Sequence, residues 1–353
     1  MSTTENRVDA EAAAATPRRS SNGGADVATF AVRHHKGPWR SAEDVSHRLA
    51  VVGLWILMFF FFAAIEPSKM LQTSAIKSIF DSQEPLVFLS MAALATLSVG
   101  EFDLSVASVL GLCAVALPIL VDSHGMNVVL AIFITLGIGV AAGAFNAFVT
   151  VVVGVDGFIV TLGSGTMLLG IASWISGDET VSGLPNGLTN AANTQLLGLP
   201  LTFFYGVVIA LIFAYISSFT PLGRRMTFVG ANREVARLAG VRVARIRFCS
   251  YIVGSTIAAL GGILLVASLG GFQSSSATIY LLPAISAVFL GTAVIQPGRF
   301  NAIGGLIGVY FLATGILGLQ LLGLGGWIQN VFYGAALVVA VAVSTLVRRR
   351  RGR

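Results

Sequence analysis

The stretch GRRMTFVGANREVARLAGVRVARIRF, residues 223–248, carries seven arginines and one glutamate. It separates two long apolar runs in a chain of 353 residues, of which 55% are hydrophobic and only 11% are charged. Soluble globular domains carry about 25% charged residues, so this composition is typical of a membrane protein. The stretch therefore predicts a basic loop between two membrane-spanning helices.

Ten apolar runs extend along the chain from residue 48 to residue 347, with polar segments between them. A helix needs roughly 20 apolar residues to cross the hydrocarbon core of a bilayer, and each run is near that length. The runs cover residues 48–65, 85–100, 104–121, 127–153, 158–176, 199–219, 248–272, 281–296, 301–320 and 326–347. They predict an all-α integral membrane protein of about ten spans, with no room for a separate soluble domain.

The basic residues test this count, because short loops rich in Lys and Arg stay in the cytoplasm. With an even number of spans and both termini inside, 20 of the 22 basic residues are cytoplasmic. These are the seven in the tail up to Arg48, the seven between Gly223 and Arg247, Arg299, and the five that follow Val347. Only Lys69 and Lys77 fall outside, so we expect cytoplasmic N- and C-termini.

The two ends of the chain differ from its apolar body. Residues 1–47 are rich in Ala, Ser, Gly and charge without an apolar period, which predicts a disordered cytoplasmic tail. This tail does not resemble a secretory signal, since the first apolar run begins near Leu49 and no small-residue cleavage site closely follows it. We expect a transmembrane domain over 48–347, with a cytoplasmic loop at 221–247, and a basic cytoplasmic tail at 348–353.

Composition argues against several other classes of protein. The net charge of +6 does not indicate nucleic-acid binding, because the basic residues lie at the ends of apolar runs and not on one amphipathic face. Cys113 and Cys249 lack the paired spacing of metal sites or disulfides, so we expect both to be packing residues. The four histidines lie in the tail or in loops. No metal, cofactor or nucleophile motif is therefore expected, and an enzyme has little support.

The middle of the opening stretch has helix signals of its own. Asn232 can cap a short helix, Glu234 lies in its first turn where the macrodipole favours negative charge, and Gly240 is placed to end it. The apolar side of this helix is formed by Val235, Leu238 and Ala239, and its basic side by Arg233 and Arg237. The pattern predicts a small amphipathic helix on the cytoplasmic face, and such a surface suggests a partner.

Four stretches carry a resemblance to a known family. They are LSVGEFDLSVASVLGL (97–112), FNAFVTVVVGVDGFIVTLGSGTMLLGIASWISG (145–177), GRRMTFVGANREVARLAGV (223–241) and AISAVFLGTAVIQPGRFNAIGGLIGV (284–309). The first resembles the segment Gly-Gly-Ile-Asp-Leu-Ser-Val-Gly-Ser, and the second an Asn-Gly turn followed by Phe-Ile-x-Thr-Leu-Gly. The third resembles the loop Gly-Arg-x-x-x-x-x-Gly-x-Asn-x-x-Ala-x-x-x-Gly-Val, and the fourth the segment Ala-Ile-x-Ala-x-x-x-Gly with the glycine-rich span after it. These are segments of the inner-membrane permeases of ABC-type sugar importers of the ribose, xylose and galactose class.

The resemblance implies a role for the 221–247 loop. In such permeases the cytoplasmic loop after the sixth span carries the coupling helix that docks into a groove of the ATP-binding subunit. The residues expected to couple this chain to an ATPase are Gly230, Asn232, Glu234, Arg237, Gly240 and Val241. An ordinary basic loop is the alternative.

The chain has no recognisable ATP-hydrolysing loop. None of its lysines, Lys36, Lys69 and Lys77, completes the G-x-x-x-x-G-K-[S/T] motif that binds phosphates. Energy from ATP would therefore have to come from another polypeptide. The resemblance implies three partners, namely an ATP-binding cassette ATPase, a second permease copy or paralogue, and an extracytoplasmic sugar-binding protein.

The segment VGEFDLSV (99–106) places Glu101 and Asp103 between two apolar runs. An acid near the bilayer centre costs roughly 2.5–3.5 kcal/mol on insertion scales, so it usually faces protein, water or substrate. The segment is either a cytoplasmic turn, where acids are cheap, or a helix broken at Gly100 that lines a cavity. The resemblance favours a place near the translocation path, although Glu101 and Phe102 stand where the family has Gly and Ile. That departure puts the substrate in doubt.

Polar residues also occur inside apolar runs, where helix packing is the default interpretation. The candidates for the translocation path are Glu101, Asp103, Ser105, Asn146 and Thr161. The triplet Phe-Asn-Ala occurs at 145–147 and again at 300–302. This repetition is consistent with an inverted five-plus-five pseudo-repeat but is too short to establish one.

Together these features predict a multi-pass permease of the bacterial inner membrane that moves a small sugar or sugar-like solute inward. The alternative from another class is a proton-coupled secondary carrier that uses Glu101 and Asp103 as relays. The sequence names neither the sugar nor the composition of the permease pair. It also leaves the depth of the 99–106 segment open.

Overall fold

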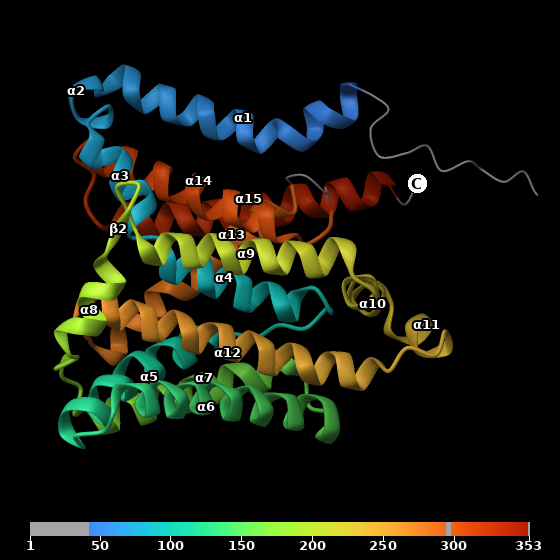
Figure 1. Ribbon diagram of the computed structural model, residues 1–353. Helices are drawn as coiled ribbons and strands as arrows, with labels where there is room; N and C mark the ends of the chain where they lie inside the picture. The colour runs from blue at the N-terminus through green and yellow to red at the C-terminus, as the bar shows by residue number, and fades with distance from the viewer. Residues whose placement is uncertain (1–41, 294–297, 352–353) are drawn as a thin grey trace, which may run out of the picture. The chain divides into compact units, whose positions relative to one another are not determined.

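The computed structural model describes residues 42–293 and 298–351, most of which are helical. The helices that follow the apolar runs are α1 (Ala42–Ile65), α4 (Glu84–Leu97), α5 (Val106–Pro118), α6 (Val128–Ala147), α7 (Gly157–Ser176), α9 (Leu201–Phe219), α12 (Val243–Leu269), α13 (Leu281–Gly291), α14 (Ala302–Leu321) and α15 (Trp327–Arg351). Each predicted run overlaps one of these helices (Figure 1). The expectation of an all-α membrane protein is confirmed.

Seven helical segments of the described chain are long and apolar enough to cross a membrane. Two of them include π-helical ends, η1 (Ile119–Ser123) after α5 and η2 (Phe148–Val153) after α6, and another includes the 3-10 helix η3 (Ser274–Tyr280) before α13. Shorter apolar helical stretches cover Val51–Ile65 and Trp327–Ala342. The number of about ten spans and the side of the membrane on which the termini lie stay predictions.

The central helix is α4, in which every residue from Glu84 to Leu97 is buried. It packs against α9, α12, α13 and α14, while α5 lies beside α12 and α7. With 14 residues, α4 is about 21 Å long at 1.5 Å per residue, shorter than the hydrocarbon core of about 30 Å. Its neighbours α9, α12 and α14 are longer, so the polar chain at both ends of α4 is flanked by helices.

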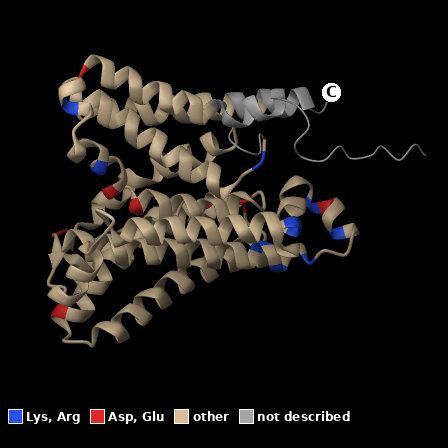
Figure 2. Cartoon of the chain, turned by 45° about the horizontal axis from the view of Figure 1, so that its top comes forward, with Lys and Arg blue, Asp and Glu red and all other residues tan. Residues whose placement is uncertain are grey.

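The connections gather at the two ends of the helices. One end, which we call the arginine end, carries α10 (Pro221–Ala231) and α11 (Arg233–Leu238). The opposite end carries α2 (Pro67–Met70), α3 (Thr73–Asp81) and α8 (Asn186–Asn193). Figure 2 shows basic residues concentrated around α10 and α11, and the lysines of α2 and α3 at the opposite end. This separation agrees with the distribution of basic residues from which the topology was predicted.

Two short antiparallel sheets lie at the opposite end. β1 (Val181–Ser182) pairs with β4 (Gly271–Phe272), and β2 (Gln195–Leu196) pairs with β3 (Leu199–Pro200). The first pairing ties the 177–198 connection to the chain that follows α12. This connection therefore has fixed structure of its own, which its turn-rich sequence did not predict.

The predicted tails lie mostly outside the described residues. Residues 1–41 of the expected N-terminal tail are among those not described, and α1 begins at Ala42, before the predicted boundary at 47. At the other end α15 continues to Arg351, so most of the expected 348–353 tail is helical in backbone. Neither finding tests on which side of the membrane the tails lie.

Glycines bring α13 and α14 into close contact, as their number in the apolar runs suggested. An added Cβ at Gly308 would overlap the carbonyl oxygen of Ala287, and one at Gly291 would lie 2.5 Å from Gly304 C and Gly305 N. The sequence GGLIG in α14 is thus a packing seam. No larger residue fits at Gly308 without movement of the backbone.

The repeated Phe-Asn-Ala triplet occupies different structural positions. Asn146 is buried within α6, near its C-terminal end. Asn301 precedes α14 and caps it, since its Oδ1 accepts a hydrogen bond from Gly304 N at 2.6 Å. The triplet therefore adds no support to an inverted repeat, which stays a prediction.

Candidate coupling site and buried polar network

The loop between α9 and α12 begins with a capped helix. Thr220 has extended backbone, and its hydroxyl accepts a hydrogen bond from Gly223 N at 3.3 Å. Pro221 takes the first helical position, where a missing N–H costs nothing and the fixed φ suits a helix. The sequence reading missed α10, although Thr-Pro before a helical segment is a start signal.

α11 begins where the sequence predicted. The Asn232 side chain accepts a hydrogen bond from Val235 N at 3.1 Å, which satisfies one of the free N–H groups of the first turn. Glu234 lies in that turn and forms an exposed ion pair with Arg237 at 3.0 Å. An exposed pair of this kind contributes about 0.3–0.5 kcal/mol, so it supports the helix only weakly.

The end of α11 is also as predicted. Gly240 has φ +79°, in the left-handed region that glycine adopts without strain. Its N–H donates to Arg237 O, and Val241 N donates to Ala236 O, both at 3.0 Å. This pair of bonds is the Schellman motif, which closes the C-terminal end of a helix.

One side of α11 is exposed and the other is packed. Leu238 is 85% exposed and Val235 is 48% exposed, whereas Ala236 is fully buried. Ala236 belongs to a small hydrophobic cluster with Val99 and Val229, separate from the main core. The helix therefore rests on the turn that follows α4 and presents leucine and valine outward.

Glu101 joins this loop to the helices. Its carboxylate is buried, forms an ion pair with Arg233 at 2.8 Å, and accepts hydrogen bonds from Arg247 Nε and from the Tyr251 hydroxyl, the latter at 3.1 Å. Arg233 comes from α11, while Arg247 and Tyr251 come from α12. We call these four residues the Glu101 junction. Ion pairs and hydrogen bonds together compensate the burial of the carboxylate charge.

Glycines allow the three chain segments of this region to meet. An added Cβ at Gly230 in α10 would lie 2.5 Å from Ser98 O, and one at Gly157, at the start of α7, would overlap the Tyr251 hydroxyl. Gly100 has φ +76°, and its carbonyl accepts a hydrogen bond from Arg233 at 2.7 Å. The 98–101 turn and α10 thus approach at backbone distance, and the start of α7 packs against the Tyr251 and Glu101 side chains.

A buried polar network continues from Glu101 toward α5. Ser105 donates from its hydroxyl to Asp103 Oδ1 at 2.6 Å, and its hydroxyl accepts a bond from Asn146 Nδ2 at 2.8 Å. The Thr161 hydroxyl accepts a bond from Leu104 N at 3.1 Å. The five residues predicted for the translocation path are therefore buried and adjacent. Their role in transport stays a prediction, because burial alone does not define a path.

Comparisons with known proteins also indicate a membrane permease. Residues 78–341 match the family described as branched-chain amino acid transport system / permease component. The chain belongs to this permease family. The autoinducer 2 import system permease protein LsrD of Salmonella paratyphi A is 31% identical over 314 residues, which cover 86% of this chain and 92% of that protein. LsrC of Salmonella paratyphi B is 29% identical over 293 residues, or 83% of this chain and 84% of LsrC. No solved structure gives a significant match.

The family membership confirms the resemblance to permeases of ABC-type sugar importers. The chain is a multi-pass protein of the bacterial inner membrane and a transport component, which is not itself an enzyme.

The 99–106 segment connects α4 to α5 beside the loop that carries α10 and α11. Helix α4 ends at Leu97, and the chain then runs without helix to Ser105. Glu101 and Asp103 are 4% and 3% exposed, whereas Gly100 and Phe102 between the helices are exposed. The segment is therefore a turn whose two acids are buried, and both interpretations, the cytoplasmic turn and the broken helix that lines a cavity, stay predictions.

Sequence reasoning missed Arg233, Arg247 and Tyr251 as functional candidates. It placed Arg233 on the outer basic side of the helix and explained Arg247 by topology alone, yet both pair with Glu101. A signal was available, because an acid near the membrane needs a basic or hydrogen-bonding partner. The arginine-rich stretch was the obvious place to look for one.

Proposed function

We propose that this chain is the membrane-spanning subunit of an ABC importer that moves a small sugar or sugar-like solute into the cytoplasm. ATP hydrolysis takes place in a separate cassette subunit. Family membership over most of the chain and the names of the relatives, which are permeases of autoinducer 2 import systems, support the proposal. The identity of the solute is left at the level of a small polar compound.

One observation carries the coupling role, namely that α11 is exposed on one side and ion-paired to the helices on the other. Leu238 and Val235 offer an apolar surface to the ATPase. On the inner side, Arg233 reaches Glu101 and Gly100. Movement of the ATPase against α11 would therefore act directly on the chain between α4 and α5.

Movement of the Glu101 junction would be transmitted to the buried polar network that follows it in the chain. Glu101 is followed in the chain by Asp103 and Ser105, which bond to each other and to Asn146 of α6. We propose that displacement of the Glu101 junction shifts this segment relative to α6 and α7. The network then opens toward the translocation path in another conformation of the transport cycle.

The remaining partners follow from the family. The relatives LsrC and LsrD are two named permeases of autoinducer 2 import systems, which supports pairing of this chain with a second permease. The opposite end, with α8 and its two small sheets, is the proposed docking surface for an extracytoplasmic binding protein. The arginine end faces the cytoplasm in this arrangement, with both termini on the same side.

The coupling role is tested by purifying the tagged permease in mild detergent from its native host and measuring ATPase activity in the eluate. Leu238→Asp places a charge on the exposed apolar surface, and we expect co-purifying ATPase activity to fall at least roughly tenfold, as for an interface hot spot. Leu197→Asp is the matched control, since Leu197 is 90% exposed at the opposite end. Full ATPase activity with Leu238→Asp would contradict the coupling role.

The energy source distinguishes this proposal from a proton-coupled carrier. Glu101 is engaged by two arginines and a tyrosine, so its carboxylate oxygens already have partners within the chain. We expect uptake of labelled sugars to persist under a proton uncoupler while cellular ATP is held constant. Collapse of uptake under these conditions would favour the carrier.

A further inference from the structure

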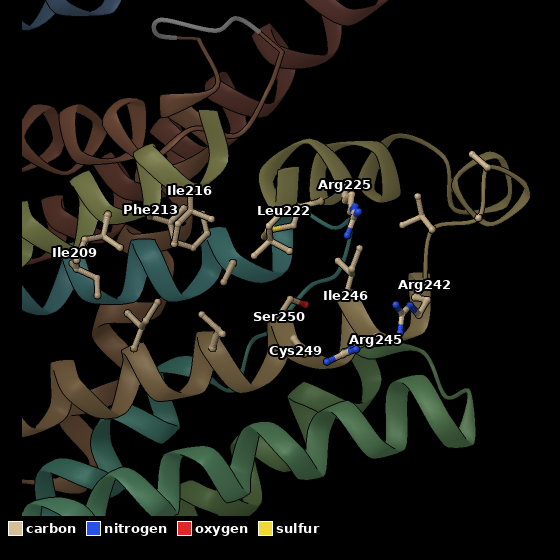
Figure 3. A pocket seen from close by; sticks show the side chains of 18 residues that line it. Ile209, Phe213, Ile216, Leu222, Arg225, Arg242, Arg245, Ile246, Cys249 and Ser250 are labelled. Atoms are coloured by element: carbon tan, nitrogen blue, oxygen red, sulfur yellow. The ribbon is translucent and has the colours of Figure 1, made fainter. Parts of the chain in front are cut away.

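A large apolar groove lies between α9 and α12, and the connection from α11 to α12 lines one end of it. Its volume is about 660 Å³, within the range of ligand sites. Both helices pack on α4, whose Ala95 contributes to the lining. The walls include Ile209, Phe213 and Ile216 of α9 and Ile257 of α12 (Figure 3). Because α9 and α12 are candidate spans, these walls lie at the depth of lipid chains.

Three arginines line one end of the groove. Arg225 lies on α10, and Arg242 and Arg245 lie at the start of α12 (Figure 3). All three are exposed, and none of their side chains forms an ion pair or a hydrogen bond with another described residue. Positive charge is thus concentrated where the two spans end and is not neutralised by the part of the chain described.

We propose that this groove binds an anionic phospholipid. Its phosphate would lie among Arg225, Arg242 and Arg245, and an acyl chain would follow the isoleucines of α9 toward Ile257. Basic pockets between membrane helices are known to hold anionic headgroups, and each basic residue near a membrane surface adds to the attraction. A soluble peptide fits less well, because the apolar walls lie along membrane spans and offer few hydrogen-bonding groups to a backbone.

The site also offers a chemical probe. Both cysteines were expected to be packing residues, but only Cys113 is buried, whereas Cys249 is exposed and lines the groove. A lipid in the groove would shield Cys249 from thiol reagents dissolved in water. The buried Cys113 would react slowly in any case, so one reactive thiol reports on occupancy.

The test uses the full-length permease, delipidated in detergent and titrated with phosphatidylglycerol or phosphatidylcholine in native mass spectrometry. We expect phosphatidylglycerol to bind at least roughly tenfold more tightly, a difference of about 1.4 kcal/mol. The triple variant R225Q/R242Q/R245Q should lose this preference. Arg224→Gln is the matched control, because Arg224 is exposed on the same helix but does not line the groove. Equal binding of both lipids by the wild type would overturn the proposal.

A second measurement locates the bound lipid and detects other occupants. In nanodiscs, phosphatidylglycerol should slow the labelling of Cys249 by a water-soluble maleimide several-fold relative to phosphatidylcholine. Ile212→Trp narrows the groove and leaves the arginines in place, so it should remove both the protection and the tight binding. Retention of tight binding by Ile212→Trp would mean that the headgroup adsorbs outside the groove. Disulfide formation through Cys249 between two copies, in place of lipid protection, would instead identify a protein interface.

Discussion

Two buried glutamates stand at the two ends of α4 and differ in how their charge is compensated. Glu101, beyond the C-terminal end, is held by two arginines and a tyrosine from α11 and α12. Glu84, in the first turn of α4, accepts a hydrogen bond from the Ser268 hydroxyl at 3.0 Å. No described lysine or arginine forms an ion pair with Glu84.

Because of this difference, we expect Glu101 to transmit movement and Glu84 only to hold two helices together. Glu84 and Ser268 join α4 to α12, with a neutral donor and the helix N-terminus near the carboxyl group. Glu101 joins the same two helices but also reaches α11, whose outer side is exposed. A change in the position of α11 therefore alters the partners of Glu101, whereas Glu84 has no contact with that loop.

The largest effect is expected from Glu101→Gln. Removal of the Glu101 charge leaves the Arg247 charge without its partner, and breaking a buried ion pair in this way lowers stability by about 3 kcal/mol. The pair with the half-exposed Arg233 adds little to this loss, because solvent screens it. Thermal unfolding in detergent, followed by size-exclusion chromatography, should show a lower transition temperature. Uptake by vesicles should fall at least roughly tenfold. An unfolding temperature equal to that of the wild type would show that the junction does not stabilise the fold.

Gly230→Ala tests the backbone contact beneath the junction. The added Cβ would lie 2.5 Å from Ser98 O, and overpacking against backbone typically costs about 1–3 kcal/mol. We expect lower stability and reduced uptake, because α10 and the 98–101 turn must separate. Gly163→Ala is the control, since Gly163 in α7 has no other atom within 4 Å of the added Cβ. Equal stability of the two variants would show that the close contact between α10 and the 98–101 turn is not needed for coupling.

Arg233→Gln and Arg237→Gln compare the inner and outer charges of α11. Arg233 reaches Glu101 and the Gly100 carbonyl, whereas Arg237 pairs only with the exposed Glu234. We expect Arg233→Gln to cost about 1–2 kcal/mol and to uncouple ATP hydrolysis from uptake. Arg237→Gln should change stability by less than about 0.5 kcal/mol. The ratio of solute transported to ATP hydrolysed in proteoliposomes is the measurement. The same ratio in both variants would argue against transmission through Arg233.

The helix α11 and the residue Arg247 show what the sequence could and could not predict. Apolar runs, the Asn232 cap and the Gly240 terminus depend on neighbouring residues, so the helices and α11 could be placed from the sequence. The pairing of Arg247 with Glu101 joins residues 146 apart, and no local pattern contains it. The topology rule accounts for the charge of Arg247 by itself, so it gave no indication that this charge also pairs with Glu101.

The translocation candidates illustrate the same limit in another form. The network of Asp103, Ser105, Asn146 and Thr161 was assembled from a resemblance and from polarity inside apolar runs. These residues come from the segment before α5 and from α6 and α7, and their contacts join positions 41 and 57 residues apart. Polarity identified the residues, but only the fold could show that Ser105 bonds to Asp103 and Asn146 and that Thr161 bonds to the backbone of Leu104.

Ser268→Ala, at the opposite end of α4, is expected to lower stability slightly and to leave transport unchanged. The Ser268 hydroxyl donates to Glu84 and also lies within hydrogen-bonding distance of Leu265 O, so its loss removes a hydrogen bond worth about 1 kcal/mol. Stability measured as for Glu101→Gln should fall slightly, while uptake and the ratio of ATP hydrolysed to solute transported should stay at wild-type values. Glu84 remains near the N-terminus of α4, which limits the cost. If Ser268→Ala impaired coupling as strongly as Arg233→Gln, both ends of α4 would take part in transmission, and the distinction between the two glutamates would fail.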